Sequence, residues 1–195
     1  LGGADTHRLA DGTYDISAKT IDIEGVANNT LDLDSIGTGN KTLTLDGADV
    51  ANVGIIIGES VVGAVTTLNF NNNANISTAV TSNVDTVTIA GANQALTLAK
   101  GGFIAGNFST VTGSGSSDLV MGTAATAVDL TNTTISGFDL INVSTSTGAG
   151  NLVTIDAASI SNAAALTFTA AADTILAVTE DYSATNWTVT AVTLD

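Results

Sequence analysis

The sequence of 195 residues contains neither cysteine nor proline. The absence of cysteine excludes disulfide bonds and thiol chemistry, and it is compatible with either redox compartment. The absence of proline carries more structural information. An extended ladder of strands uses nearly every backbone N–H group, and proline has none to offer. We therefore expect the turns to be built from glycine and asparagine.

Positive charge is scarce. Charged residues make up 12% of the chain, the net charge is −15, and the four Lys and Arg residues are Arg8, Lys19, Lys41 and Lys100. So few cations cannot neutralise phosphate groups, so the sequence excludes a nucleic-acid partner and disfavours anionic membrane surfaces. No segment approaches the roughly 18 consecutive apolar residues of a membrane-spanning helix, so we expect no membrane insertion.

Aromatic residues are also few, at 4%, although hydrophobic residues reach 44%. Small and branched apolar side chains suit thin layers better than a bulky globular core. Short segments rich in Val, Ile, Leu and Thr alternate with a period of two residues, which is typical of strands. The predicted strands are 15–23, 30–33, 41–45, 53–57, 64–70, 85–89, 95–98, 118–121, 127–130, 140–144, 152–155, 165–169, 174–178 and 187–194.

The predicted strands follow one another at intervals of about ten residues, separated by Gly, Asn, Asp and Ser. This spacing predicts an all-β fold. The favoured architecture is a parallel β-solenoid, a β-helix-like stack of short strands with about 20–25 residues in each coil. One or two antiparallel β-sandwich domains have the same short-strand signature and remain the alternative.

The chain is expected to form a single elongated β-repeat domain over residues 1–195. Three similar phrases, each an apolar–Thr–apolar strand running into a turn of small residues, align on Thr44, Thr97 and Thr154. They define loose internal units near 41–94, 95–151 and 152–195. Because the chain begins at Leu1 rather than Met, we interpret it as a fragment of a longer secreted protein.

No catalytic motif is present, and we expect no enzyme activity. His7 is the only histidine, and no Gly-x-Ser-x-Gly nucleophile elbow accompanies it at a strand-to-helix turn. Carboxylate pairs such as Asp32 and Asp34 exist, which leaves a polysaccharide-active enzyme as a minor hypothesis. Aspartates near glycine and asparagine more often cap the local backbone in turns.

Of the 19 acidic residues, 16 are aspartate. Short carboxylates suit tight turns and cation sites, so Ca²⁺ is the expected cofactor if there is one. The clusters that could supply ligands lie near the start of the chain and around residue 47. The candidate calcium ligands are Asp5, Asp11, Asp15, Asp46 and Asp49.

Thr-x-Thr pairs raise the hypothesis of an ice-binding face. Such a face needs the pair at the same place in successive coils. The intervals between the pairs considered, 44, 81 and 21 residues, are not a constant coil period, so the β-propensity of threonine is the simpler explanation. These pairs are 42–44, 86–88, 167–169 and 188–190.

Two segments carry a resemblance to a known class of proteins. The segment from Asp129-Leu130-Thr131 to Ile135-Ser136-Gly137-Phe138-Asp139-Leu140-Ile141-Asn142-Val143 resembles a strand unit of bacterial S-layer and large adhesin proteins related to the RTX class. Leu1-Gly2-Gly3-Ala4-Asp5-Thr6 is similar to the end of the RTX calcium-binding nonapeptide. The resemblance implies secretion, a β-solenoid or β-rich layer, Ca²⁺-assisted folding and lateral self-assembly.

We therefore expect an extracellular structural protein, an S-layer or surface-filament subunit on a bacterial cell surface, whose main partner is itself in a lattice or filament. The alternative is an adhesin segment that binds a glycan or host surface, including cell-surface polysaccharide, through Trp187, Tyr182 or Tyr14. An ice-binding protein and a polysaccharide-active enzyme are less favoured.

Overall fold

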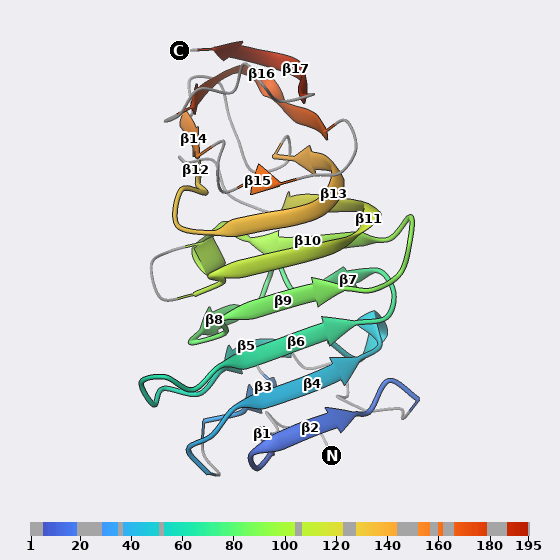
Figure 1. Ribbon diagram of the computed structural model, residues 1–195, viewed down its shortest axis with the longest axis vertical. Coiled ribbons are helices and arrows are strands. Elements are labelled where there is room, and N and C mark those ends of the chain that lie inside the picture. The colour runs from blue at the N-terminus through green and yellow to red at the C-terminus, as the bar shows by residue number, and fades with distance from the viewer. Residues whose placement is uncertain are drawn as a thin grey trace.

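The computed structural model describes residues 6–18, 29–34, 37–50, 53–103, 107–122, 128–143, 152–156, 160–161, 166–178 and 187–194. Within these residues the chain is nearly all β, and every strand pairing is parallel. The coils stack into one β-solenoid, with β1 and β17 at opposite ends (Figure 1). The predicted solenoid is confirmed, and the antiparallel sandwich alternative is wrong.

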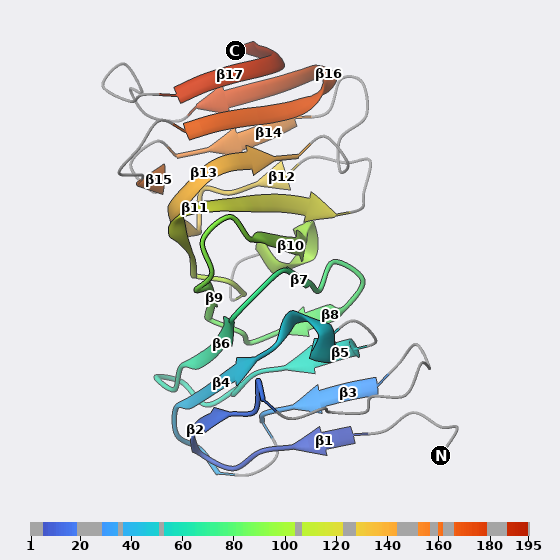
Figure 2. The ribbon, with the colours of Figure 1, turned by 90° about the vertical axis from the view of Figure 1, so that its right-hand side faces the viewer.

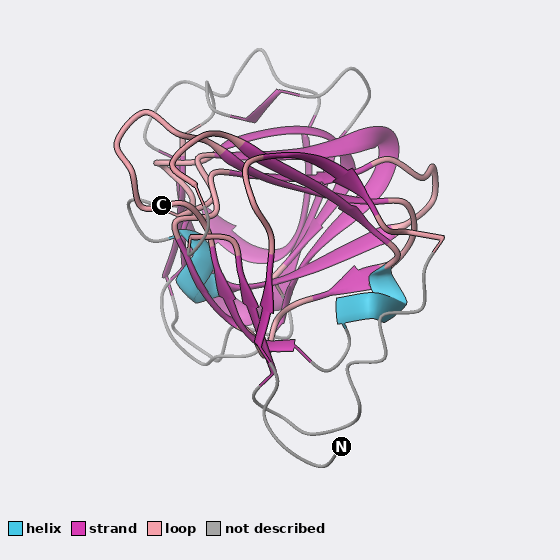
Figure 3. Cartoon of the chain, turned by 90° about the horizontal axis from the view of Figure 1, so that it is seen from below, coloured by secondary structure: helices cyan, strands magenta, loops and turns pink. Residues whose placement is uncertain are grey.

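The coils form three walls around a filled interior, seen along the stacking axis in Figure 3. Wall one contains β1 (Thr6–Arg8), β3 (Asn29–Asp32), β5 (Val53–Ile57), β8 (Val80–Ser82), the 3-10 helix η2 (Lys100–Phe103), β12 (Val128–Asp129) and β14 (Leu152–Ile155). Wall two contains β2 (Gly12–Asp15), β4 (Lys41–Leu45), β6 (Thr66–Phe70), β9 (Thr86–Ile89), the first parts of β11 (Thr110–Gly122) and β13 (Thr134–Asn142), and β15 (Ile160–Ser161).

Wall three begins with the 3-10 helix η1 (Gly47–Val50) and continues through β7 (Ala74–Asn75) and β10 (Ala95–Ala99). The second parts of β11 and β13 follow, and then the first parts of β16 (Leu166–Val178) and β17 (Trp187–Leu194). The side view in Figure 2 shows how the strands of successive coils lie over one another.

The coil period agrees with the sequence prediction. Thr42 pairs with Thr67, and Thr86 pairs with Thr110, so one coil there takes about 25 residues, as expected for stacked repeats. Most other strand pairings have a similar period. The three similar phrases do not mark this period, because Thr44, Thr97 and Thr154 lie in β4, β10 and β14, which belong to three different walls.

The interior is filled by ladders of aliphatic side chains. In wall two, alternate residues point inward and stack coil upon coil, and each member of this ladder is at most 1% exposed: Leu43, Leu68, Val87, Val111 and Ile135. Four phenylalanine side chains, each at most 3% exposed, also lie in the interior: Phe70, Phe103, Phe108 and Phe138. Because side chains alternate in direction along a strand, every second residue of each wall lies in the apolar interior.

Side chains at the corners tie one coil to the next. The Asp85 carboxylate accepts a hydrogen bond from the backbone N–H of Thr66 at 2.8 Å, and the Asn107 amide oxygen accepts one from the N–H of Asn83 at 2.6 Å. These corner amides would otherwise have no partner, because the wall ladders end there. Asparagine and aspartate are abundant in this chain partly because the corners need short acceptors.

Corner chemistry also explains a wrong strand prediction. The sequence predicted a strand over 15–23, whereas β2 ends at Asp15, and residues 16–18 are not strand. The Asp15 carboxylate accepts hydrogen bonds from the N–H of Ser17 at 3.1 Å and from its hydroxyl at 2.7 Å, which turns the chain. Residues 19–23 lie outside the described residues.

Four long strands, β11, β13, β16 and β17, each pass through two walls. β11 and β13 bend side by side, and Gly137 at the bend has a φ of 73°. A Cβ atom on Gly113 would lie 2.4 Å from the carbonyl oxygen of Gly137, and one on Gly137 would lie 2.3 Å from that of Gly113. Only glycine lets the two backbones approach this closely.

Core packing gives the first prediction. Leu68→Ala should destabilise the fold by about 2–5 kcal/mol, because it leaves a cavity in a closed ladder. Val80→Ala, at a side chain that is 70% exposed on wall one, should stay within about 0.5 kcal/mol of the parent. Equilibrium denaturation of both variants is the measurement, and equal effects would contradict the assigned inward and outward faces.

Candidate functional site

The 60–65 loop, which enters β6, presents the most exposed apolar side chain among the described residues. Val62 is 100% exposed, and Val61 and Val65 are 41% and 40% exposed. The Ala64 N–H donates to the Val61 carbonyl at 3.0 Å, and Gly63 has a φ of 89°, so the tip is a tight turn. The loop projects to the left of the stack in Figure 1. Apolar side chains exposed in this way mark interaction surfaces more often than scattered single ones do.

Both ends of the loop are bonded to the preceding coil. The Ser60 N–H and hydroxyl donate to one carboxylate oxygen of Asp34 at 2.9 and 2.8 Å. The Val65 N–H donates to the Asn40 amide oxygen at 2.9 Å. The hydrogen bonds from Ser60 lower the pKa of Asp34, so this anchor is ionised at neutral pH. The tip is therefore preorganised.

A buried ion pair lies beneath the loop. The side chains of Lys41 and Glu59 are each 1% exposed, and the Lys41 ammonium donates to the Glu59 carboxylate. The ammonium also lies 2.9 Å from a carboxylate oxygen of Asp11. The other Glu59 oxygen accepts from the Val61 N–H at 3.1 Å, which connects the pair to the loop.

The two carboxylates outweigh the cost of burying the ammonium. Burial by itself lowers the pKa of Lys41, but the bonds to Glu59 and Asp11 raise it above 10.5 overall. A raised lysine pKa stabilises the fold below the unfolded value, and that contribution is lost only as the pH rises through the folded pKa. The pair is therefore intact across the physiological range, and the Lys41 bond in turn holds the pKa of Asp11 low.

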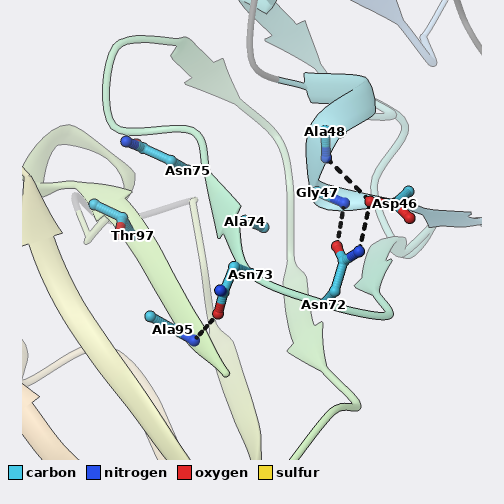
Figure 4. Close-up of a pocket in the computed structure, with 9 residues that line it drawn as sticks. All are labelled: Asp46, Gly47, Ala48, Asn72, Asn73, Ala74, Asn75, Ala95 and Thr97. Atoms are coloured by element: carbon cyan, nitrogen blue, oxygen red, sulfur yellow. Dashed lines mark hydrogen bonds between the residues drawn. The ribbon is translucent and has the colours of Figure 1, made fainter. Parts of the chain in front are cut away.

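A groove of about 510 Å³ lies at the opposite end of β6, between η1, β7 and β10 (Figure 4). Of the three alanines in its lining, Ala48 is exposed, Ala95 is half-buried, and Ala74 is buried in the core. The full set of lining residues is Asp46, Gly47, Ala48, Asn72, Asn73, Ala74, Asn75, Ala95 and Thr97. The groove and the 60–65 loop therefore flank one strand at the same height in the stack.

Much of the polar lining of the groove is already engaged. The Asn72 amide accepts from the Gly47 N–H at 2.7 Å and donates to Asp46 at 2.6 Å. The Asn73 amide oxygen accepts from the Ala95 N–H at 2.7 Å. Figure 4 shows these bonds running between coils. An occupant of the groove would thus meet alanine methyl groups and amides whose oxygens already have partners.

The predicted calcium ligands do not converge. Asp5 lies outside the described residues, and Asp11 and Asp15 accept hydrogen bonds at separate corners. Asp46 and Asp49 are neighbours, but the Asp49 carboxylate accepts from the Asp46 N–H at 3.0 Å, so this pair caps η1. In the described ranges, no group of three or more His, Asp or Glu residues could hold a metal ion. Calcium binding stays a prediction.

A second carboxyl pair was missed in the sequence. Asp118 on β11 and Asp139 on β13 lie on paired strands, and one oxygen of Asp139 is buried with no hydrogen-bond partner in the described part of the chain. Burial, then repulsion by the Asp139 carboxylate and a hydrogen bond from protonated Asp118 to Asp139, raise the pKa of Asp118. Asp139 lies in the segment that carries the family resemblance, but nothing in the sequence links it to Asp118, so only the strand register reveals the pair.

Of the residues proposed for glycan stacking, Tyr14 and Trp187 lie on strands at opposite ends of the stack. Tyr14 is half-buried against the core of wall two, and its hydroxyl donates to the Asp11 carbonyl at 3.4 Å. Trp187 begins β17 at the far end of the stack. Tyr182 lies outside the described residues.

The buried ion pair gives a second prediction. Lys41→Met should destabilise the fold by about 3–5 kcal/mol, because it leaves the Glu59 carboxylate buried without its counter-charge. Lys41→Met combined with Glu59→Leu should recover much of that loss. Chemical denaturation of the single and double variants tests this, and a double variant as unstable as the single one would contradict it.

The carboxyl pair gives a third prediction. A raised folded pKa means that Asp118 favours the fold most below its unfolded value of 3.8 and that this contribution is lost as the pH rises through the folded pKa. Asp118→Asn should therefore stabilise the protein at pH 7, by at most about 1 kcal/mol because the group is partly exposed. It should have no stabilising effect near pH 3. Thermal unfolding at both pH values is the measurement, and a variant that is less stable at pH 7 would contradict the assignment.

No helix among the described residues is long and apolar enough to cross a membrane. Comparison of the chain with family models, with curated proteins and with solved structures finds no match. The geometry of the braced loop, the groove and the walls is therefore the basis for any functional conclusion.

Proposed function

We propose that this chain is an extracellular structural segment whose β-solenoid packs side by side with copies of itself, in a lattice or filament on a bacterial surface. The observation that carries the proposal is the 60–65 loop, with Val62 fully exposed on a rigid stem. An exposed apolar tip on a rigid stem lowers the solubility of an isolated molecule, and contact with a partner removes the tip from water.

The position of the groove supports a second copy as that partner. The loop precedes β6 and the groove residues Asn72 and Asn73 follow it, so the two features lie at opposite ends of this strand. A copy displaced sideways along β6 would bring its loop to the groove of its neighbour. A contact between two different surfaces of one molecule forms an open row when successive copies are displaced without a rotation that closes a ring.

The two surfaces also match chemically. The 60–65 loop contains no charged residue, and the groove lining includes the exposed Ala48 and the half-buried Ala95. Burying one valine side chain contributes about 1.5–3 kcal/mol. Such a contact is weak singly and becomes effective when it is repeated along a row.

Electrostatics sets the conditions for assembly. Each copy carries a net charge of −15, so neighbouring copies repel one another at low ionic strength. Salt screens this repulsion over about 10 Å at 0.1 M. Calcium ions would reduce this repulsion further by binding exposed carboxylates, so calcium-assisted assembly is part of this proposal.

A glycan-binding adhesin segment is the second candidate, favoured by the asparagine and threonine side chains around the groove. Asn75 and Thr97 lie at its wall-three side. The lining contains no aromatic residue, and aromatic faces are the usual stacking platforms for sugar rings. Self-assembly is therefore the better-supported function.

The test of assembly uses Val62→Asp, with Val80→Asp as the matched control at another exposed valine. The parent should form larger species as protein concentration, NaCl and CaCl₂ increase, and Val62→Asp should abolish them because a charge would enter an apolar contact. Val80→Asp should assemble as the parent does. Sedimentation velocity and electron microscopy, with and without chelator, are the measurements.

Mixing two variants sharpens the test. Ala48→Arg should fill the groove and also block assembly. In an equimolar mixture, the intact groove of Val62→Asp can still receive the intact loop of Ala48→Arg, so the mixture should give dimers and no longer rows. A parent that remains monomeric at high concentration in salt and calcium would overturn the proposed function.

A further inference from the structure

Six threonines stack in register along wall two. The outward position next to the inner ladder is threonine in each of six successive strands, from β2 through β4, β6, β9 and β11 to β13. These residues, here called rank one, are Thr13, Thr42, Thr67, Thr86, Thr110 and Thr134. Figure 1 shows β2, β4, β6 and β9 one above another with their arrows in the same direction.

A second rank runs beside the first, two residues further along each strand. Five of its six members carry a hydroxyl or an amide, and the sixth, Asp15, lies at the β2 end. Rank two consists of Asp15, Thr44, Asn69, Thr88, Thr112 and Ser136. Wall two therefore displays a two-dimensional array.

The array has regular dimensions. Neighbouring strands in a sheet are about 4.8 Å apart, and alternate residues of one strand are about 6.7 Å apart. Threonine is β-branched, so its side-chain torsion is restricted and its hydroxyl and methyl are held in place without further ordering. No hydroxyl of rank one has a hydrogen-bond partner within the described part of the protein. The hydroxyls are available to water.

The β-propensity of threonine does not account for this array. Wall one is built from the same kind of strands, and its outward row in register is mixed: Thr6, Thr30, Ile55 and Val80. The equivalent row of wall three is also mixed: Asn75, Thr97, Val120 and Asn142. If propensity alone selected threonine, all three walls would show it equally. The uniform rank is confined to wall two.

We propose that wall two binds the surface of ice. A rigid array of hydroxyl and methyl groups at these spacings holds a layer of ordered water whose pattern repeats along two directions, as the oxygen lattice of ice does. The methyl groups keep the first-layer water ordered, and the hydroxyls fix it by hydrogen bonds. This inference stands apart from the lateral contact, which uses the loop and the groove.

Ordered water fits this wall better than a crystalline polysaccharide does. Sugar rings are usually held by exposed aromatic faces, and neither rank contains an aromatic residue. The one aromatic residue of β2, Tyr14, occupies the inward ladder position in register with Leu43 and packs against the core. The only charged side chain in the two ranks is that of Asp15, so the remaining positions are neutral.

Pair-by-pair inspection of the sequence missed this array. The Thr-x-Thr pairs 42–44 and 86–88 belong to wall two, whereas 167–169 and 188–190 belong to β16 and β17. On the other strands of wall two, the same two outward positions are occupied by Thr67 and Asn69 on β6 and by Thr110 and Thr112 on β11. Because coil lengths differ, the intervals along rank one are uneven even though the strands are in register.

Ice partitioning tests the proposal. A dilute solution of the whole chain is frozen slowly onto a cold surface, and the protein in the ice and in the remaining liquid is measured, together with the growth of ice crystals below the melting point. The parent should enter the ice fraction and arrest growth. Thr67→Tyr with Thr86→Tyr should fall to the level of a protein that ice excludes, because two rings at the centre of the array break its contact plane.

Thr154→Tyr, at an outward position of β14 in wall one, is the matched control and should bind ice as the parent does. Thr88→Tyr with Thr112→Tyr, in rank two, repeats the test should the first pair fail to fold as judged by circular dichroism. Exclusion of the parent from ice overturns the proposal, and so does equal loss in the wall-two and control variants. Binding of the parent to microcrystalline cellulose but not to ice would also overturn it, in favour of a polysaccharide surface.

Discussion

The parallel backbone ladder between successive coils is the constraint on which the rest of this structure depends. Each coil both donates backbone hydrogen bonds to and accepts them from the coils on either side, so no coil is complete alone. Proline cannot take part in such a ladder and is absent from the sequence. The ladder stops at the corners, where short side chains such as Asp85 and Asn107 accept the remaining N–H groups. The same need explains why aspartate is so frequent in a chain with few other charges.

The ladder also determines where function can reside. Alternate residues of each strand are committed to the interior, so the chain can vary only its outward ranks and its corners. Wall two uses its outward ranks for a uniform threonine array, while the corners before and after β6 carry an apolar loop and an apolar groove. The Lys41–Glu59 pair is buried in a largely apolar interior, and we infer from its place beneath the loop that rigidity at that corner offsets the cost of burying charge. The remaining surfaces have few charged side chains, and they suit packing and adsorption better than catalysis.

Strand alternation could be read from the sequence wherever a strand has a clear inward side. The segments 41–45, 53–57, 152–155 and 187–194 have the predicted bounds. β1, β7, β8 and β15 were not predicted, because they have two or three residues and no apolar alternation, and only pairing with a neighbouring coil makes them strands. The candidate sites were harder still. Asp46 and Asp49 were singled out as calcium ligands and prove to be corner caps, while Lys41 with Glu59, and Asp118 with Asp139, become neighbours only through the register. Coil lengths vary from corner to corner, so the register that aligns the threonines cannot be obtained by counting along the chain.

The central claim is that threonines at uneven intervals along the chain stack in one straight rank. A double-cysteine variant tests it directly, because the natural sequence has no cysteine and two labels would be unique. Thr13 and Thr134 lie five strand steps apart in rank one. With spin labels at these two positions, pulsed electron spin resonance should give one narrow distribution at a distance of about 24 Å, the sum of five strand spacings, allowing for label length. A broad distribution, or a mean distance far from this value, would contradict the stacked register and with it the account of both the array and the assembly surfaces.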